Sequence, residues 1–398
     1  MIGKKYIYLD HVNGTPVHPD VVEVMAEHQK NVYGNPQSPH TPGQKALEAL
    51  DKARNQVASL INAQDDEIYF TSSGSESNNF ALTGLFSANQ KKGSHIVVSA
   101  VEHFSVLHPA KRMEKNGFKV TEIPVDRTGR VDPDDVKKAL RDDTVLVSVM
   151  LANGEVGTIQ PVQKISGLCR EKGILLHTDA VAAVGNMPVD VKALGVDALS
   201  LAGNPFYGPK GSAALFVRKG VRIRPFIEGG IQEGGRRAGT ENLAGIVGMG
   251  AASALAAEKM ESRMTEMKAL RDRVIEQLPQ AVDHIHLTGH PTDRLPHHAS
   301  FCVEFIEGEA MLLSLDMKGI AASSGSACTS KALKASHVLL AMGYDHALAQ
   351  GSLVFSFIEN NGREDIEYLL KTFPPIVDRL RGMSPLYAKY LEENKNVQ

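Results

Sequence analysis

One cysteine stands where its thiol could react. Cys328 lies in the run SSGSACTS at residues 323–330, in which almost every residue is small or hydroxylated. Gly and Ser are typical of segments that turn sharply, and the run has too few apolar side chains to pack as a core, so we expect a loop. A loop thiol is more exposed and more often ionised than a buried one. The pattern therefore predicts a reactive cysteine, and the alternative is an ordinary surface thiol.

The other two cysteines are predicted to be buried. Cys169 falls in a helix expected to pack on a sheet, and Cys302 lies in the apolar run SFCVEF, which is typical of a buried strand. The wide, unpatterned spacing of the three cysteines fits neither a disulfide framework nor a metal-binding motif, and it indicates a reducing compartment. With no signal peptide and no run of about 20 apolar residues, we expect a cytoplasmic protein without a membrane span.

Two side chains with acid–base chemistry follow predicted strands. His103 comes after the strand at residues 95–100, and Asp179 follows the strand at 174–178. In sheets built from parallel strands, ligands bind at the carboxyl ends of the strands. Both side chains are therefore candidates for a binding site at that edge. A purely structural role is the alternative for the histidine.

A third candidate is an anion site where a strand meets a helix. The segment TSSGSESNNFALTGLF begins at the end of the strand at 67–71 and places Gly74 and Ser75 at a helix start. Backbone N–H groups there can hold a phosphate. Ser and Gly are also good helix caps, so capping is the alternative.

Strands and helices alternate along the chain from residue 67 to residue 201. This order predicts an α/β fold with a mostly parallel sheet covered by helices on both faces. With 398 residues, 42% of them hydrophobic, the chain is long enough for a large and a smaller domain. The net charge of −3, with 22% charged residues of both signs, argues against a nucleic-acid-binding protein.

The motifs in their order resemble those of the NifS/IscS-type cysteine desulfurases. The matching segments are YGNPQSPH at 33–40, TSSGSESNN at 71–79, the dipeptide EH at 102–103, YGPKG at 207–211 and RRAGTEN at 236–242. The resemblance implies a fold-type I, aminotransferase-like homodimer that uses pyridoxal phosphate. It also implies a large domain at 17–256 and a small domain formed by 1–16 and 257–398. A seven-stranded type of sheet is expected in the large domain and an α+β arrangement in the small one.

The resemblance also implies a role for individual residues. His103 would stack on the pyridine ring as a candidate acid or base, and Asp179 would pair with the pyridine nitrogen. Gly74 and Ser75 would hold the phosphate, which Thr240 of the neighbouring subunit would also contact. Asn35 would meet the substrate carboxylate, and Cys328 would carry a persulfide or act as a ligand of a shared iron–sulfur cluster.

Other positions depart from the family pattern, and each departure deletes a functional group. The family segment reads Ser-x-His-Lys-x-x-Gly-Pro-Lys-Gly, and its first lysine forms the Schiff base with the cofactor. Pro205 stands at that position here. The other lost positions are Gly154 and Ala182 for two cofactor contacts, Ala202 and Asn204 for the serine and histidine of the lysine segment, and Val354 for the arginine that binds the substrate carboxylate.

Three functions remain compatible with this pattern. The first is a sulfur-transfer or iron–sulfur assembly protein that lacks the Schiff-base chemistry and uses Cys328 with a scaffold or sulfur-acceptor protein. The second is an active cysteine desulfurase that converts L-cysteine to L-alanine and a protein persulfide with non-covalent pyridoxal phosphate. The third is a structural or regulatory pseudoenzyme subunit.

The sequence predicts an order of thiol reactivity. A limiting amount of alkylating reagent added to the native protein should label Cys328 first, because burial in apolar surroundings hides a thiol and raises its pKa. Peptide mapping by mass spectrometry measures the order. Faster labelling of Cys169 or Cys302 would contradict this expectation.

Overall fold

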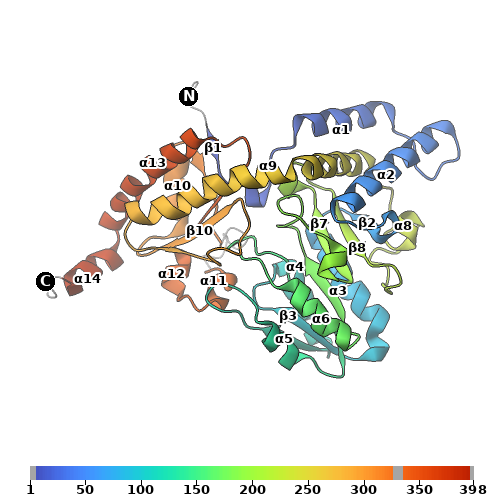
Figure 1. Ribbon diagram of the computed structural model, residues 1–398, viewed down its shortest axis with the longest axis horizontal. Helices are drawn as coiled ribbons and strands as arrows, with labels where there is room; N and C mark the ends of the chain where they lie inside the picture. Colours follow the sequence, from blue (N-terminus) through green and yellow to red (C-terminus); the bar gives the residue numbers. More distant parts are fainter. Residues whose placement is uncertain (1–5, 326–334, 395–398) are drawn as a thin grey trace.

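The residues that the structure describes, 6–325 and 335–394 of a computed structural model, contain one seven-stranded sheet (Figure 1). β8 runs antiparallel to both of its neighbours, and the remaining strand pairs are parallel. In spatial order the strands are β2 (Ile68–Thr71), β8 (Ala213–Val217), β7 (Ala198–Ala202), β6 (Leu175–Asp179), β5 (Thr144–Ser148), β3 (His95–Ser99) and β4 (Lys119–Ile123). The predicted α/β class is thereby confirmed, and β8 is a strand that the sequence patterns did not reveal.

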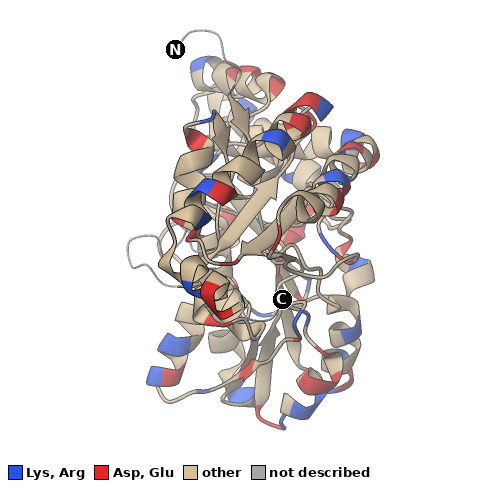
Figure 2. Ribbon diagram, turned by 90° about the vertical axis from the view of Figure 1, so that its left-hand side faces the viewer, with Lys and Arg blue, Asp and Glu red and all other residues tan. Residues whose placement is uncertain are grey.

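Helices cover both faces of this sheet, because its inner strands are apolar on both sides. The apolar core on one face includes side chains of α1 (Pro19–Asn31), α2 (Thr41–Leu60), α5 (Pro133–Ala139), α6 (Val162–Glu171) and α7 (Val191–Leu194). The core on the other face is formed with α3 (Gly74–Asn89) and α4 (Phe104–Lys115). The short helix α8 (Gln232–Gly235) follows β8. Charges of both signs are interspersed over the outer helices (Figure 2).

A second, smaller sheet lies in the C-terminal part of the described chain, with the strand order β12–β10–β9. Its antiparallel strands are β9 (Ile285–Leu287), β10 (His298–Val303) and β12 (Ser352–Ser356). α10 (Gly308–Asp316) and α13 (Arg363–Gly382) supply side chains to its core. The N-terminal strand β1 (Ile7–Tyr8) pairs with β11 (Ile320–Ala321), so the chain start belongs to this part. α11 (His337–Ala341), α12 (His346–Gln350) and α14 (Pro385–Asn394) complete it.

One long helix, α9 (Leu243–Ala281), connects the two parts (Figure 1). Ile246 and Met249 near its start belong to the core of the large sheet, whereas Val274 and Leu278 near its end belong to the core of the small sheet. The predicted domain boundary at residue 256 falls inside this helix, so the division into two domains stays a prediction. No helix in the described ranges is long and apolar enough to cross a membrane.

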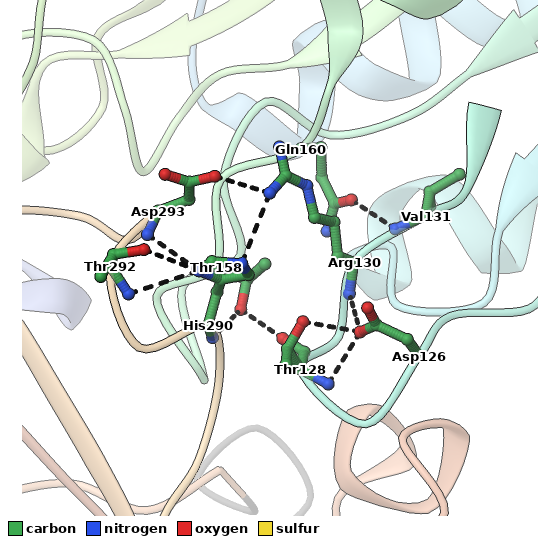
Figure 3. Close-up of polar contacts among 9 residues, drawn as sticks. All are labelled: Asp126, Thr128, Arg130, Val131, Thr158, Gln160, His290, Thr292 and Asp293. Carbon is green, nitrogen blue, oxygen red and sulfur yellow. Dashed lines mark hydrogen bonds and ion pairs between the residues drawn. The ribbon is translucent and has the colours of Figure 1, made fainter.

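Polar contacts also join loops of the two parts (Figure 3). The Arg130 guanidinium lies after β4 and donates to Asp293 Oδ2 over 2.6 Å. The His290 backbone N–H donates to Thr158 Oγ1 over 2.9 Å, and Thr158 in turn donates to the carbonyl of Thr128. These bonds attach the turn between β9 and β10 to the edge of the large sheet.

A buried ion pair lies closer to the middle of the molecule. Arg263 on α9 is 2% exposed, and its Nε donates to Glu359 Oε2 over 2.8 Å. The guanidinium carbon lies 4.4 Å from the centre of the Tyr207 ring, which directly follows the turn that contains Pro205. Burial raises the pKa of Tyr207 to about 12. This contact thus joins α9, the segment after β12 and the turn after β7.

Replacing Glu359 should destabilise the fold. Glu359→Gln leaves the buried Arg263 cation without its counterion, and Nη1 of Arg263 already has no partner among the described residues. We expect the free energy of unfolding to fall by about 2 kcal/mol, measured by denaturant titration.

Glu367→Gln is the matched control. Glu367 forms exposed pairs with Arg273 and Arg363, so its loss should leave the unfolding midpoint unchanged. Equal effects of the two substitutions would contradict a structural role for the Arg263 pair.

Candidate functional site

A cavity of about 330 Å³ opens at the carboxyl ends of the parallel strands, between the large sheet and the segments around Ser323 and Val354. It receives residues that follow β2, β3, β5, β6 and β7. Four of the predicted site residues line it, namely Gly74, Ser75, His103 and Asp179. The six positions at which we expect departures from the family pattern line it as well, namely Gly154, Ala182, Ala202, Asn204, Pro205 and Val354. Residues that lie far apart in the sequence therefore meet at one site.

The remaining predicted site residues lie elsewhere. Asn35 is exposed in the loop between α1 and α2, where its Oδ1 accepts from the Gln37 N–H over 2.9 Å, as in an ordinary turn. Thr240 is exposed between α8 and α9 and does not line the cavity of its own chain. Cys328 lies outside the described residues. Ser323 and Gly325, just before it in the sequence, do line the cavity.

A chain of hydrogen bonds connects the two acid–base residues. Asn78 Nδ2 lies 2.6 Å from Asp179 Oδ2 and 2.8 Å from Ser105 Oγ, which in turn lies 2.6 Å from His103 Nδ1. The Ser105 N–H donates to the same ring nitrogen over 3.1 Å, so Nδ1 is an acceptor and the neutral ring carries its proton on Nε2. The network fixes both rotamers and the tautomer. Sequence patterns missed Asn78 and Ser105, although Asn78 lies within the TSSGSESNN motif.

The first turn of α3 is well capped and crowded. Ser73 caps the helix by accepting from the Glu76 N–H over 3.1 Å, and Arg237 donates to the Glu76 carboxylate over 2.9 Å. A Cβ atom at Gly74 would lie 2.6 Å from Cγ2 of Val181, so this valine already fills the space beside the helix start. A residue larger than glycine at position 74 would therefore clash with Val181.

The described residues around the cavity include several carboxyl groups and no lysine or arginine. The carboxyl groups are those of Glu102, Glu155 and Asp179. Lys210 of the GPKG turn is exposed and does not line the cavity. A phosphate dianion in this cavity would therefore meet no lysine or arginine among the described lining residues of its own chain.

Glu102 is a buried acid that sequence patterns did not single out. Its side chain is fully buried, and Oε1 accepts from Ser99 Oγ over 2.6 Å and from the Met150 N–H over 2.7 Å. Oε2 has no partner among the described residues. Burial raises the pKa of Glu102 to about 8, so near neutral pH most of the carboxyl groups carry a proton.

Pro205 forms part of the cavity wall. It is buried in the short turn η4 (Asn204–Phe206), and its carbonyl accepts from Asn186 Nδ2 over 3.3 Å. A proline offers no primary amine to the cavity. Gly154 and Ala182 face each other nearby, since a Cβ at Gly154 would lie 4.0 Å from Cβ of Ala182. Val12 Cγ2 lies nearer still, 3.5 Å from the same Cβ position.

The two described cysteines are buried, which confirms the expectation from their sequence context. Burial raises the pKa of both Cys169 and Cys302 to about 12. In the described ranges no group of three or more His, Cys, Asp or Glu side chains is placed to hold a metal ion.

Comparisons with known proteins agree with this architecture. Residues 7–369 match the model of the aminotransferase class-V family. The chain is 48% identical to "Cysteine desulfurase IscS" of Methanosarcina thermophila over 97% of this chain and 95% of that protein. It is 45% identical to "Cysteine desulfurase IscS 1" of Archaeoglobus fulgidus over 96% of this chain and 100% of that protein.

A solved structure of a NifS-like protein superimposes with a TM-score of 0.89 at 36% identity, covering 94% of this chain and 100% of that one. A NifS-like protein from Rickettsia africae gives a TM-score of 0.86 at 30% identity, with the same two coverages. The chain therefore belongs to the aminotransferase class-V family and, within it, to the cysteine desulfurases of the IscS and NifS type.

Pyridoxal phosphate is the cofactor of this family, and the cavity fits it only in part. Asp179 and His103 line the cavity, and the start of α3 offers backbone N–H groups. However, Pro205 provides no amine for a covalent bond, and the described lining contains no lysine or arginine for the phosphate.

The raised pKa of Glu102 predicts a pH-dependent stability. Because the folded pKa of about 8 exceeds the ordinary value of 4.5, the folded state keeps a proton that the unfolded state has already lost. The contribution of Glu102 therefore falls as the pH rises between these two values, by on the order of 1 kcal/mol per pH unit.

Glu102→Gln keeps an oxygen for Ser99 and Met150 but cannot ionise. Its free energy of unfolding relative to wild type should therefore increase from pH 5.5 to pH 8.5 in denaturant titrations. The exposed substitution Glu114→Gln should follow the wild-type profile. Parallel profiles for Glu102→Gln and wild type would show that Glu102 ionises normally.

Proposed function

We propose that the protein mobilises sulfur and carries the sulfur atom on Cys328, without Schiff-base chemistry in its cavity. The observation that supports this most directly is Pro205, which is buried in the cavity wall at the position where the family resemblance places the lysine. The retained sequence SSGSACTS supports a role for the thiol, and Ser323 and Gly325, the described residues that precede Cys328 in this sequence, line the cavity.

The chemistry of such a carrier needs no cofactor. The Cys328 thiolate attacks the outer sulfur of a donor persulfide, the donor's S–S bond breaks, and the donor leaves as a thiolate. A second exchange of the same kind passes the sulfur to an acceptor protein and regenerates the Cys328 thiolate. The persulfide proton follows the outer sulfur or exchanges with water, so atoms and electrons balance. The same thiolate could instead ligate an iron–sulfur cluster held by a scaffold protein.

An active cysteine desulfurase is the second candidate, and the names of the relatives favour it, because those proteins are called cysteine desulfurases. This function converts L-cysteine to L-alanine and leaves a persulfide on Cys328. It requires pyridoxal phosphate held without a covalent bond by Ser75, His103 and Asp179, which remain in the cavity. A structural subunit is the third candidate, and it leaves the thiol segment without a role.

We also propose a homodimer in which Thr240 reaches the cavity of the other subunit. Tyr33 and Ile231 support an interface, since these apolar side chains are 80% and 77% exposed in the single chain. Tyr33 lies in the loop of Asn35, so a second copy would also bring that loop into contact with its partner.

A persulfide-transfer assay distinguishes these candidates. With a persulfide donor and no L-cysteine, wild type should pass labelled sulfur to an acceptor thiol, and Cys328→Ser should reduce transfer at least tenfold. Cys169→Ser and Cys302→Ser are the controls, because both thiols are buried and should leave transfer unchanged.

The second arm supplies L-cysteine and pyridoxal phosphate without a persulfide donor. The carrier proposal expects no sulfide release and no alanine. Robust release of both would favour the active desulfurase. Equal transfer by Cys328→Ser and wild type in the first arm would leave the structural subunit as the better account.

A further inference from the structure

A second cavity, of about 700 Å³, lies at the opposite edge of the large sheet. Its lining residues lie at the starts of β6 and β7, at the end of β8 and at the ends of α3 and α6. The first cavity, in contrast, lies at the carboxyl ends of the same parallel strands. The two cavities share no described lining residue. Ligand binding in the second cavity can therefore be considered separately from cofactor binding in the first.

The side chains around this second cavity are strongly basic. Its described lining contains Lys92, Arg170, Arg218, Lys219 and Arg222, against the single carboxylate of Asp197. The chain as a whole carries a net charge of −3, so this local charge opposes the overall balance. A concave site lined by charges of one sign concentrates the field and attracts ligands of the opposite sign.

Asp197 fixes one of these cations rather than neutralising the cavity. Its carboxylate is 8% exposed, and Oδ2 accepts from the Leu176 N–H over 2.8 Å. Oδ1 accepts from Arg218 Nε over 3.0 Å, so both carboxylate oxygens are occupied. Lys219 Nζ pairs with Asp66 over 2.8 Å on the outer side. The bond to Asp197 holds Arg218 in one orientation, while most of the Arg218 side chain remains exposed.

The other three cations are not neutralised within the described chain. Lys92, Arg170 and Arg222 are exposed and form no ion pair with any residue of 6–325 or 335–394. Gly195 provides the space for one of them, since a Cβ there would lie 2.5 Å from Arg170 Nη2. The three come from different segments. Lys92 belongs to η3 (Gln90–Lys92), which follows α3, Arg170 lies near the end of α6, and Arg222 lies in the loop after β8. Their mutual repulsion would be relieved by a multiply charged anion.

The cavity also has an apolar side. Ile174, Leu175 and Val221 line it beside the basic groups. Guanidinium groups bind phosphate oxygens in a bidentate manner, and lysine binds phosphate as a point charge. The volume lies within the range of small-molecule sites. We infer that this cavity binds a small molecule that carries two or more adjacent phosphate groups.

Isothermal titration calorimetry at physiological ionic strength tests this site with ADP, inorganic pyrophosphate and adenosine. ADP and pyrophosphate should bind saturably with one site per chain, and adenosine should not bind measurably. Arg170→Gln combined with Arg222→Gln should weaken both phosphate ligands at least tenfold. These side chains are exposed, so the fold should persist, and a melting curve verifies this.

Lys115→Gln combined with Lys371→Gln is the matched control. These two lysines are exposed, lie outside the cavity and give the same loss of two charges. If ADP binds more tightly than pyrophosphate, the cavity is a nucleotide site. If the two ligands bind with equal affinity, the cavity recognises the diphosphate group alone. The inference is overturned if wild type does not bind either ligand at millimolar concentration, or if the two double variants bind equally. Tighter binding of an acidic peptide than of ADP would also overturn it, because the surface would then recognise a protein.

Discussion

The parallel pairing of the buried strands is the constraint on which the site depends. Backbone hydrogen bonds between β5, β6 and β7 place the carboxyl ends of these strands side by side, so that Asp179 and Ala202 reach the same cavity. The strands are apolar on both faces, which buries the sheet between two helix layers and keeps this edge in place. Loops can then vary at the cavity without altering the framework that positions them.

The cavity combines a hydrogen-bonded acid–base pair with a proline in its wall. Asp179 and His103 are still joined through Asn78 and Ser105, a network that requires accurate placement of four side chains. In the same cavity the wall contains Pro205, whose ring takes part in no acid–base or covalent chemistry. The first observation agrees with membership of the desulfurase family, and the second supports a different use of its fold.

Sequence patterns located the main features of the fold and the site for a physical reason. Buried parallel strands are short apolar runs between turn residues, so β3, β5 and β6 were predictable to within about two residues. β8 was missed although it too is a short apolar run that follows a turn. Asn78 and Glu102 were missed as site residues because their roles arise from bonds to residues distant in sequence, which periodicity does not encode. Asn35 was assigned from its motif, and in the single chain it lies outside the cavity.

The central claim is that no amine of this chain forms a covalent bond with pyridoxal phosphate in the cavity. Borohydride reduction of the protein as purified, followed by peptide mapping with mass spectrometry, tests it most directly, and the visible absorption spectrum before reduction provides an independent readout. The account predicts no absorption band of a bound cofactor that borohydride removes and no pyridoxyl-modified lysine. A stoichiometric pyridoxyl group on Lys210 or on any other lysine would contradict the claim.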